Sequence, residues 1–149
     1  MVARILCLDY GRHRIGIAVS DPLGLTAQPV ETLTGLSREK LVERVRALVE
    51  QMGVDRIVLG LPLTLKGRKG DMAIEVEKFA DKLYQQTGVP ITLWDERFTS
   101  VQAQRIIHQR GEKPSRKKEK VDLIAAVLLL QNYLDFQRES STNNHGEKM

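Results

Sequence analysis

The first 20 residues constrain the fold most, because they place two short apolar runs on either side of a glycine turn that follows an acid. Residues 5–8 are typical of a buried strand, residues 15–19 of a second one, and the segment between them predicts a hairpin. Asp9 ends the first run directly before Tyr10 and Gly11. A carboxylate at the end of such a strand has to be hydrated, paired or bound to a metal, because an isolated buried charge is too costly to keep.

The composition favours a single domain. A chain of 149 residues with 42% hydrophobic residues is long enough for one core and too short for two domains. Its one cysteine, Cys7, lies inside the first apolar run, which favours core packing in a reducing compartment over disulfide or zinc chemistry. That run stops at Asp9, too early for a signal peptide, and the apolar run 123–130 is too short to span a bilayer. We therefore expect a cytoplasmic protein without membrane association.

The apolar pattern predicts an α/β fold with a mixed five-stranded sheet flanked by helices, in which an antiparallel meander precedes parallel strands. Ser37 is expected to cap the first helix through Lys40, and Gly53 to end it. The polar residues 139–149 are expected to be a disordered tail after one domain at 1–138. Strands are predicted over residues 3–9, 15–20, 29–33, 56–60 and 91–94, helices over 38–52, 71–87, 100–109 and 120–136, and loops over 60–70 and 111–119.

Two of these helices have a predicted face toward the sheet. The second helix should direct Ile74, Phe79, Leu83 and Tyr84 inward. The last helix should pack through Val121, Ala125, Leu128, Leu129 and Asn132. Trp94 and Phe98 are expected in the core and not as platforms for stacked bases, because only 5% of the chain is aromatic.

Acidic residues from three distant segments are expected to meet at one edge of this sheet. Asp9 and the pair Asp95 and Glu96 follow strands whose carboxyl ends share an edge, where ligands of α/β sheets collect. Asp122 opens the last predicted helix, which has to lie on the sheet. Converging carboxylates repel one another unless cations lie among them, and oxygen ligands favour Mg²⁺ or Mn²⁺. Two such ions about 3.5–4 Å apart would support phosphodiester cleavage.

Each of the later acids also has a purely structural interpretation. Asp122 would be a favourable first-turn charge on the dipole of the last helix, and taken alone this interpretation is preferred. Asp95 and Glu96 would pair with Arg97 or with the neighbouring helix. Asp9 is harder to explain in this way, because a strand-end acid before a glycine leaves space for a phosphate or a metal.

The positive charge is concentrated in one stretch of the chain. Residues 97–120 hold eight basic and two acidic residues, whereas the whole chain carries a net charge of +4. Such a stripe is typical of a nucleic-acid surface, although a solvated loop explains the charge alone equally well.

Four motifs together resemble the YqgF/RuvX family of RNase H-like nucleases. They are DYGRHRIGIAVSD at 9–21, VLGLPL at 58–63, WDERFTS at 94–100 and KVDLIAAVLLLQNYL at 120–134, in the order and spacing of that family. The resemblance covers nearly the whole chain except the tail. It implies an RNase H-like fold related to Holliday-junction resolvases and a role in processing the 5′ end of pre-16S rRNA.

The resemblance also implies the site residues. Asp9, Glu96 and Asp122 would be catalytic and would bind Mg²⁺ or Mn²⁺, with Asp95 as a substitute for Glu96. The partner would be nucleic acid, either an rRNA precursor or branched DNA, and ribosomal particles are a further expected partner. Phosphate contacts are expected from Arg14, Arg97, Arg116, Lys117 and Lys118.

This chain differs from related resolvases in the source of its second acid. Those proteins carry it on the strand next to the first, where this chain has Gly60 and Leu61. Here the acid would come from the following strand, about 9–10 Å away if that strand is two places from the first. Glutamate spans more of this gap than aspartate, which favours Glu96 over Asp95.

Three other functions stay open at this stage. A non-catalytic RNA-binding factor for ribosome assembly would keep the fold and the basic stretch without a metal. A resolvase of the Holliday-junction type would act on branched DNA. The segment that begins DYG also resembles the first phosphate loop of actin-like and sugar-kinase-like ATPases, but those proteins need two domains and this chain has room for one.

Overall fold

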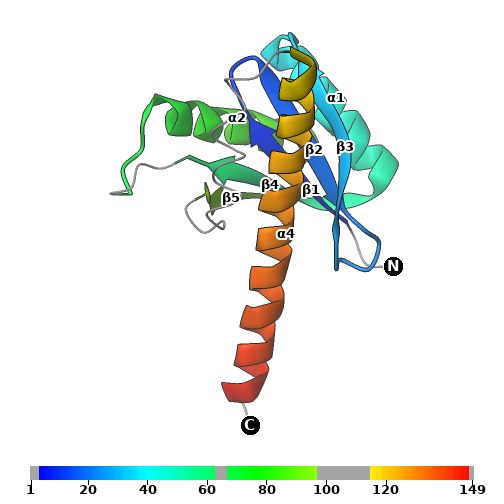
Figure 1. The fold of residues 1–149 in the computed structure, drawn as a ribbon, viewed down its shortest axis with the longest axis vertical. Coiled ribbons are helices and arrows are strands. Elements are labelled where there is room, and N and C mark those ends of the chain that lie inside the picture. The colour runs from blue at the N-terminus through cyan, green and yellow to red at the C-terminus, as the bar shows by residue number, and fades with distance from the viewer. Residues whose placement is uncertain (1–3, 63–66, 97–114, 148–149) are drawn as a thin grey trace.

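The apolar runs of the sequence form five strands of one mixed sheet, with helices on both of its faces (Figure 1). The computed structural model describes residues 4–62, 67–96 and 115–147, and within the last segment it describes the side chains from 120 to 140. The strands are β1 (Arg4–Tyr10), β2 (Arg14–Ser20), β3 (Ala27–Thr34), β4 (Val54–Leu61) and β5 (Ile91–Asp95). The helices are α1 (Arg38–Met52), α2 (Asp71–Thr87) and α4 (Ser115–Glu147). The predicted fold class is confirmed.

The strand order is β3-β2-β1-β4-β5, and the two halves of the sheet differ in direction. β1, β2 and β3 form an antiparallel meander, whereas β4 pairs with β1 and β5 pairs with β4 in parallel. β5 is therefore two places from β1, the arrangement in which the sequence favours Glu96 over Asp95. The carboxyl ends of β1, β4 and β5 meet at one edge of the sheet.

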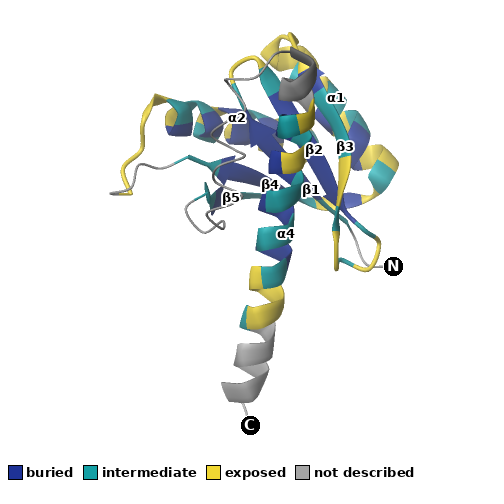
Figure 2. Ribbon diagram, in the orientation of Figure 1, coloured by how far each residue is buried: buried dark blue, intermediate teal, exposed yellow. Residues whose placement is uncertain are grey.

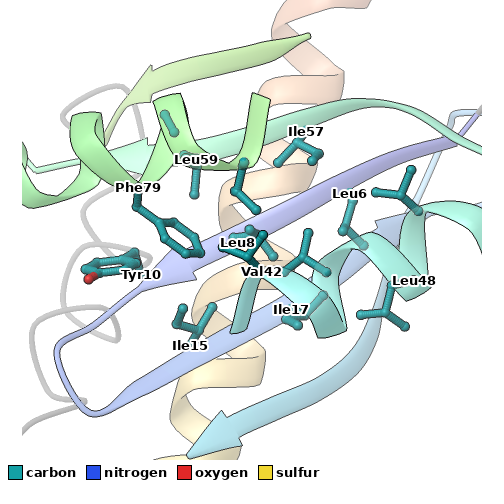
Figure 3. Close-up of a cluster of buried hydrophobic side chains, with 14 of the residues drawn as sticks. Leu6, Leu8, Tyr10, Ile15, Ile17, Val42, Leu48, Ile57, Leu59 and Phe79 are labelled. Carbon is teal, nitrogen blue, oxygen red and sulfur yellow. The ribbon is translucent and has the colours of Figure 1, made fainter. Parts of the chain in front are cut away.

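One face of the sheet packs under α1 and α2. Leu6, Leu8 and Tyr10 of β1 point to this side and are buried together with residues from both helices (Figure 3). The ring centre of Phe79 on α2 lies 5.0 Å from that of Tyr10. Because side chains alternate along a strand, the residues between them, Cys7 and Asp9, point to the opposite face.

Helix α1 begins and ends where its sequence predicts. The backbone N–H of Lys40 donates to Oγ of Ser37 at 3.2 Å, which satisfies one of the amide groups left open at the start of the helix. Gly53 ends the helix with φ 64°, a left-handed conformation that glycine adopts without strain.

The predicted inward face of α2 is right for Phe79 and Leu83 and wrong for Ile74 and Tyr84. The last two side chains are 44% and 56% exposed. Prediction by large apolar residues overlooks alanines, whose small side chains let a helix lie close to a sheet. The buried positions of α2 are Ala73, Val76, Phe79, Ala80 and Leu83.

Helix α4 covers the other face of the sheet and is longer than predicted (Figure 1). It begins at Ser115, before the expected start at Lys120, and it continues to Glu147, across residues for which the sequence predicts a disordered tail. A packed helix extends easily, because each further residue adds a backbone hydrogen bond without a new nucleation cost. Figure 2 shows α4 buried where it crosses the sheet and exposed beyond it.

The buried face of α4 includes Asp122, which the sequence predicts to lie in the first turn of the last helix. Ala125 and Leu129 are buried as predicted, whereas Val121, Leu128 and Asn132 are only half-buried. The buried face of the helix is thus rotated toward Asp122 compared with the prediction. A prediction that uses only apolar residues leaves a charged residue out of the buried face. The buried residues of α4 are Asp122, Ala125, Ala126, Leu129, Leu130, Tyr133 and Leu134.

Four further predictions fall wholly or partly outside the described residues. They are the helix at 100–109, the core position of Phe98, residues 63–66 of the 60–70 loop, and the part of the 111–119 loop that precedes Ser115. Within the described part of the chain, no helix has the length and apolar character needed to cross a membrane.

The close approach of α4 to the sheet depends on Gly16. A β-carbon at this position of β2 would lie 2.2 Å from the backbone oxygen of Asp122 and 3.2 Å from its Cβ. Real β-carbons do not approach a backbone atom so closely, so any larger residue would push α4 away from the sheet.

We expect Gly16→Ala to lower the free energy of unfolding by about 2–3 kcal/mol, toward the upper end of the range for overpacked sites. Gly70→Ala is the matched control, because no atom lies within 4 Å of the added β-carbon there. The control should change stability by about 1 kcal/mol or less. Urea denaturation monitored by circular dichroism measures both values, and equal losses would contradict the proposed close approach.

Candidate active site

Asp9 lies at the end of β1 on the face that α4 covers. It is 1% exposed and pairs in register with Gly16 of β2. Within the described part of the chain, its Oδ2 atom is enclosed and accepts no hydrogen bond. Burying a carboxylate oxygen costs free energy, so this position is unfavourable for stability and points to a functional reason for the acid.

Asp122 reaches the same region from α4. The side chain is buried, with the residue 2% exposed, and Gly16 beneath it allows the helix backbone to come close. Because α4 begins at Ser115, Asp122 is not a first-turn residue. The interpretation of Asp122 as a charge on the helix dipole is therefore wrong.

Glu96 directly follows β5 and lies on the other side of Asp9. A β-carbon at Gly60 of β4 would lie 2.8 Å from Oε1 of Glu96 and 3.0 Å from Cδ1 of Leu129, which belongs to α4. The Glu96 carboxylate therefore lies on the α4 face, over the one strand that separates β5 from β1. The missing side chain of Gly60 leaves room for it to reach toward Asp9.

Asp95 occupies the other side of β5. Leu93 packs with the core under α1 and α2, and Asp95 is the next residue in the same alternation. Trp94 instead faces α4, where its Nε1 donates to Oδ1 of Asn132 at 2.9 Å, and it is buried in the core as predicted. Of the two neighbouring acids, only Glu96 thus shares a face with Asp9.

The buried Cys7 thiol lies near enough to Asp9 and to Glu96 to be affected by the negative charge of each. Burial raises the pKa of the Cys7 thiol well above its usual value, and the negative charges of Asp9 and Glu96 raise it further. A thiol that is fully buried and neutral is inert, so Cys7 packs the core beneath the acids.

Arg14, at the start of β2, is bound to Asp122. Its Nε donates to Oδ2 of Asp122 at 2.7 Å, and the two side chains are 18% and 3% exposed. The sequence predicts a phosphate contact for Arg14, whereas the structure places at least this nitrogen on a carboxylate. No pattern in the sequence indicates this pair, because 108 positions separate its members.

Glu96 and Asp122 lie on opposite sides of Asp9, and the three acids do not form a compact cluster. Within the described ranges, no group of three or more His, Cys, Asp or Glu side chains is close enough to hold a metal ion together. Asp9 and Glu96 lie on the Gly60 side, while Asp122 lies over Gly16 and contacts Arg14.

Sequence reasoning missed the two glycines that make room for these acids. Gly16 and Gly60 stand inside apolar strands, where a glycine often marks a close approach of another group, so the signal was present. The other predicted phosphate contacts cannot be compared with the structure. Arg97 lies outside the described residues, and the side chains of Arg116, Lys117 and Lys118 in α4 are not described.

The sequence matches a family and its members along nearly its whole length. The model of the RuvX family, described as a Holliday junction resolvase, matches residues 3–136. A Chloroflexus aurantiacus protein named "Putative pre-16S rRNA nuclease" is 40% identical over 141 residues, which cover 95% of this chain and 92% of the relative. A Clostridioides difficile protein of the same name is 39% identical over 137 residues, which cover 92% of this chain and 97% of the relative.

Solved structures with this fold include the RuvC protein of Thermus thermophilus. Its complex with a Holliday junction substrate aligns with a TM-score of 0.59 at 14% identity, over 91% of this chain and 96% of the other. A second Thermus thermophilus RuvC structure aligns with a TM-score of 0.54 at 12% identity, over 90% and 96% of the two chains. At such low identity the likeness concerns the fold alone, and it confirms the RNase H-like prediction. The match of the family model over residues 3–136, together with the relatives that are 40% and 39% identical, shows that the chain belongs to the RuvX family.

Proposed function

We propose that this chain is a divalent-metal-dependent endonuclease that hydrolyses phosphodiester bonds in structured nucleic acid. The observation that carries the proposal is the convergence of Asp9 and Glu96, from strands that are not neighbours, across the gap at Gly60. A buried acid beside a second acid is costly for the fold and is typical of a functional site. The RuvX family match supports a nuclease.

The proposed substrate is precursor rRNA, cleaved at the 5′ end of pre-16S rRNA. The name shared by the relatives from Chloroflexus aurantiacus and Clostridioides difficile supports this choice. Ribosomal particles would then be a partner, and the cytoplasm would be the site of action.

The donor chemistry fits Mg²⁺ or Mn²⁺. Both ions prefer oxygen ligands, and carboxylates are the donors that Asp9 and Glu96 offer on the α4 face. Asp122 would be the third acid, while Asp95, on the other side of β5, would take no part. When bound, the ion would activate water and stabilise the charge that develops on the phosphate oxygens. A second ion stays a prediction of the sequence.

The residues of the chain would prepare this site in two ways. The enclosure of Asp9 between β2, β4 and α4 lowers the local dielectric, which strengthens the attraction between the acids and a cation. Arg97, Arg116, Lys117 and Lys118 would hold the phosphate backbone near the acids. Such contacts make affinity fall steeply with salt.

Two alternatives to this proposed function are each supported by one observation. The lack of a three-acid cluster within the described ranges favours a non-catalytic RNA-binding assembly factor. The description of the family model favours branched DNA as the substrate. Phosphate contacts do not distinguish RNA from DNA, so both substrates have to be compared directly.

Asp9→Asn should abolish cleavage while it preserves the fold, because the amide is of equal size and loses the negative charge. We expect the rate to fall about 100-fold or more, equivalent to about 2.7 kcal/mol of barrier. The assay uses a labelled pre-16S fragment and a four-way DNA junction, each with Mg²⁺ or Mn²⁺. Equal rates for both proteins would refute the site, and binding without cleavage by the wild type would favour the assembly factor.

Glu96→Gln and Asp95→Asn form a matched pair that tests which neighbouring acid acts. Glu96→Gln should lower the cleavage rate about 100-fold, because Glu96 lies over Gly60 on the Asp9 side. Asp95→Asn should leave the rate within about 3-fold of the wild type, a barrier change below 1 kcal/mol. The reverse result would assign the role to Asp95.

A further inference from the structure

A groove lies between α2 and β5, on the face of the sheet opposite to the acids. The side chain of Leu93 in β5 points to this face and packs against the core under α1 and α2. On the α2 side, Asp81 is exposed and Tyr84 is 56% exposed, so the groove is accessible from solvent. It has a volume of about 450 Å³, and its lining includes Glu77, Ala80, Asp81 and Tyr84 of α2 and Ile91 and Leu93 of β5.

The backbone of β5 directs hydrogen-bonding groups to the outer side of this groove. Among the described strands, β5 is the last in the sheet order (Figure 1). The backbone N–H of Ile57 in β4 donates to the carbonyl oxygen of Pro90 at 3.0 Å. Backbone groups alternate in direction along a strand, so the N–H and C=O groups of Ile91 and Leu93 point away from β4. The same two residues therefore present both a backbone edge and apolar side chains.

The two outer strands of the sheet differ in how they are protected against pairing with another strand. β3 contains Pro29 and the charged Glu31, and its register with β2 shifts once. Prolines, charges and bulges are means by which proteins block an exposed edge. The segment of β5 from Ile91 to Trp94 contains no proline and no charged residue. The edge of β5 is therefore suited to pairing with an extended segment.

The charges in the groove indicate which kind of segment it fits. Glu77 and Asp81 line the groove, whereas Lys78 and Lys82 of the same helix do not, although the whole chain carries a net charge of +4. Nζ of Lys69 lies 2.8 Å from Oε2 of Glu77, and within the described residues Asp81 has no such ion pair. Negative charges repel phosphate groups and attract basic side chains. The groove therefore favours a basic protein segment over nucleic acid.

We propose that the groove between α2 and β5 binds an extended, basic segment of a partner protein, which adds a strand to the sheet beside β5. Backbone hydrogen bonds to Ile91 and Leu93 supply the affinity, and a basic side chain beside Asp81 supplies the specificity. The proposal goes beyond the nuclease activity and does not depend on it, because Asp9 and Glu96 lie on the α4 face.

The test is a nuclear magnetic resonance titration of the full, isotope-labelled chain with a capped synthetic peptide of sequence VTKTVT. In an extended strand the valines and the lysine of this peptide share one face. Binding should shift the amide signals of Ile91, Leu93 and Tyr84. A peptide with glutamate in place of lysine, and one with methylated backbone nitrogens, should each bind about 10-fold more weakly or worse.

Asp81→Lys should weaken binding of the lysine peptide about 10-fold and strengthen binding of the glutamate peptide. Glu43→Lys is the matched control, because Glu43 is an exposed acid of α1 that does not line the groove and the substitution changes the net charge equally. Its affinity for both peptides should stay within about 2-fold of the wild type, because a distant exposed charge is screened by salt. Circular dichroism checks that both variants are folded.

No shift at Ile91, Leu93 and Tyr84, or equal affinity for the lysine and glutamate peptides, would overturn the proposal on the wild type alone. Shifts of the same signals on dilution would assign the groove to a second copy of the chain. Shifts of these signals with a pre-16S fragment would assign it to RNA. Either of these last two results would also overturn the proposal.

Discussion

The contact between α4 and the sheet at Gly16 determines the rest of the structure. Only a residue without a side chain fits beneath the backbone of Asp122, and this contact sets the distance between the helix and β2. The alanines at 18, 125 and 126 are buried in the same layer, so small residues keep the helix close along its path. Because of this packing, Asp122 of α4 lies over Gly16, the residue of β2 that pairs with Asp9. The geometry of the site is thus a consequence of how the core is filled.

Glycine serves a second, different purpose at position 60. At Gly16 the absent side chain makes room for a helix backbone, whereas at Gly60 it makes room for the carboxylate of Glu96. This difference explains how the carboxylate of Glu96, which directly follows β5, comes to lie over the neighbouring strand β4. The layout of the site is asymmetric, with Glu96 on one side of Asp9 and the pair of Asp122 and Arg14 on the other.

Much of the fold was accessible from the sequence because local signals determine it. The cap of α1 at Ser37 and its end at Gly53 follow from the chemistry of single residues. Asp9 was recognisable as an anomaly in an apolar strand. The reach of its side chain favoured Glu96 over Asp95 in the sequence, but the face of the sheet on which each acid lies is known only from the structure. The contact of Arg14 with Asp122 was not accessible, because it exists only when both ends of the domain have come together.

The long separation between Arg14 and Asp122 also affects when the site comes into existence. During synthesis the hairpin of β1 and β2 emerges before α4, and Asp122 follows Arg14 by 108 positions. Contacts between such distant parts of a chain form late, because the long stretch between them has to lose conformational entropy before the contacts add any stability. A partly made chain therefore carries Asp9 without its partners. Any activity that needs all of these groups begins only with the finished fold, because an incomplete chain lacks part of the site.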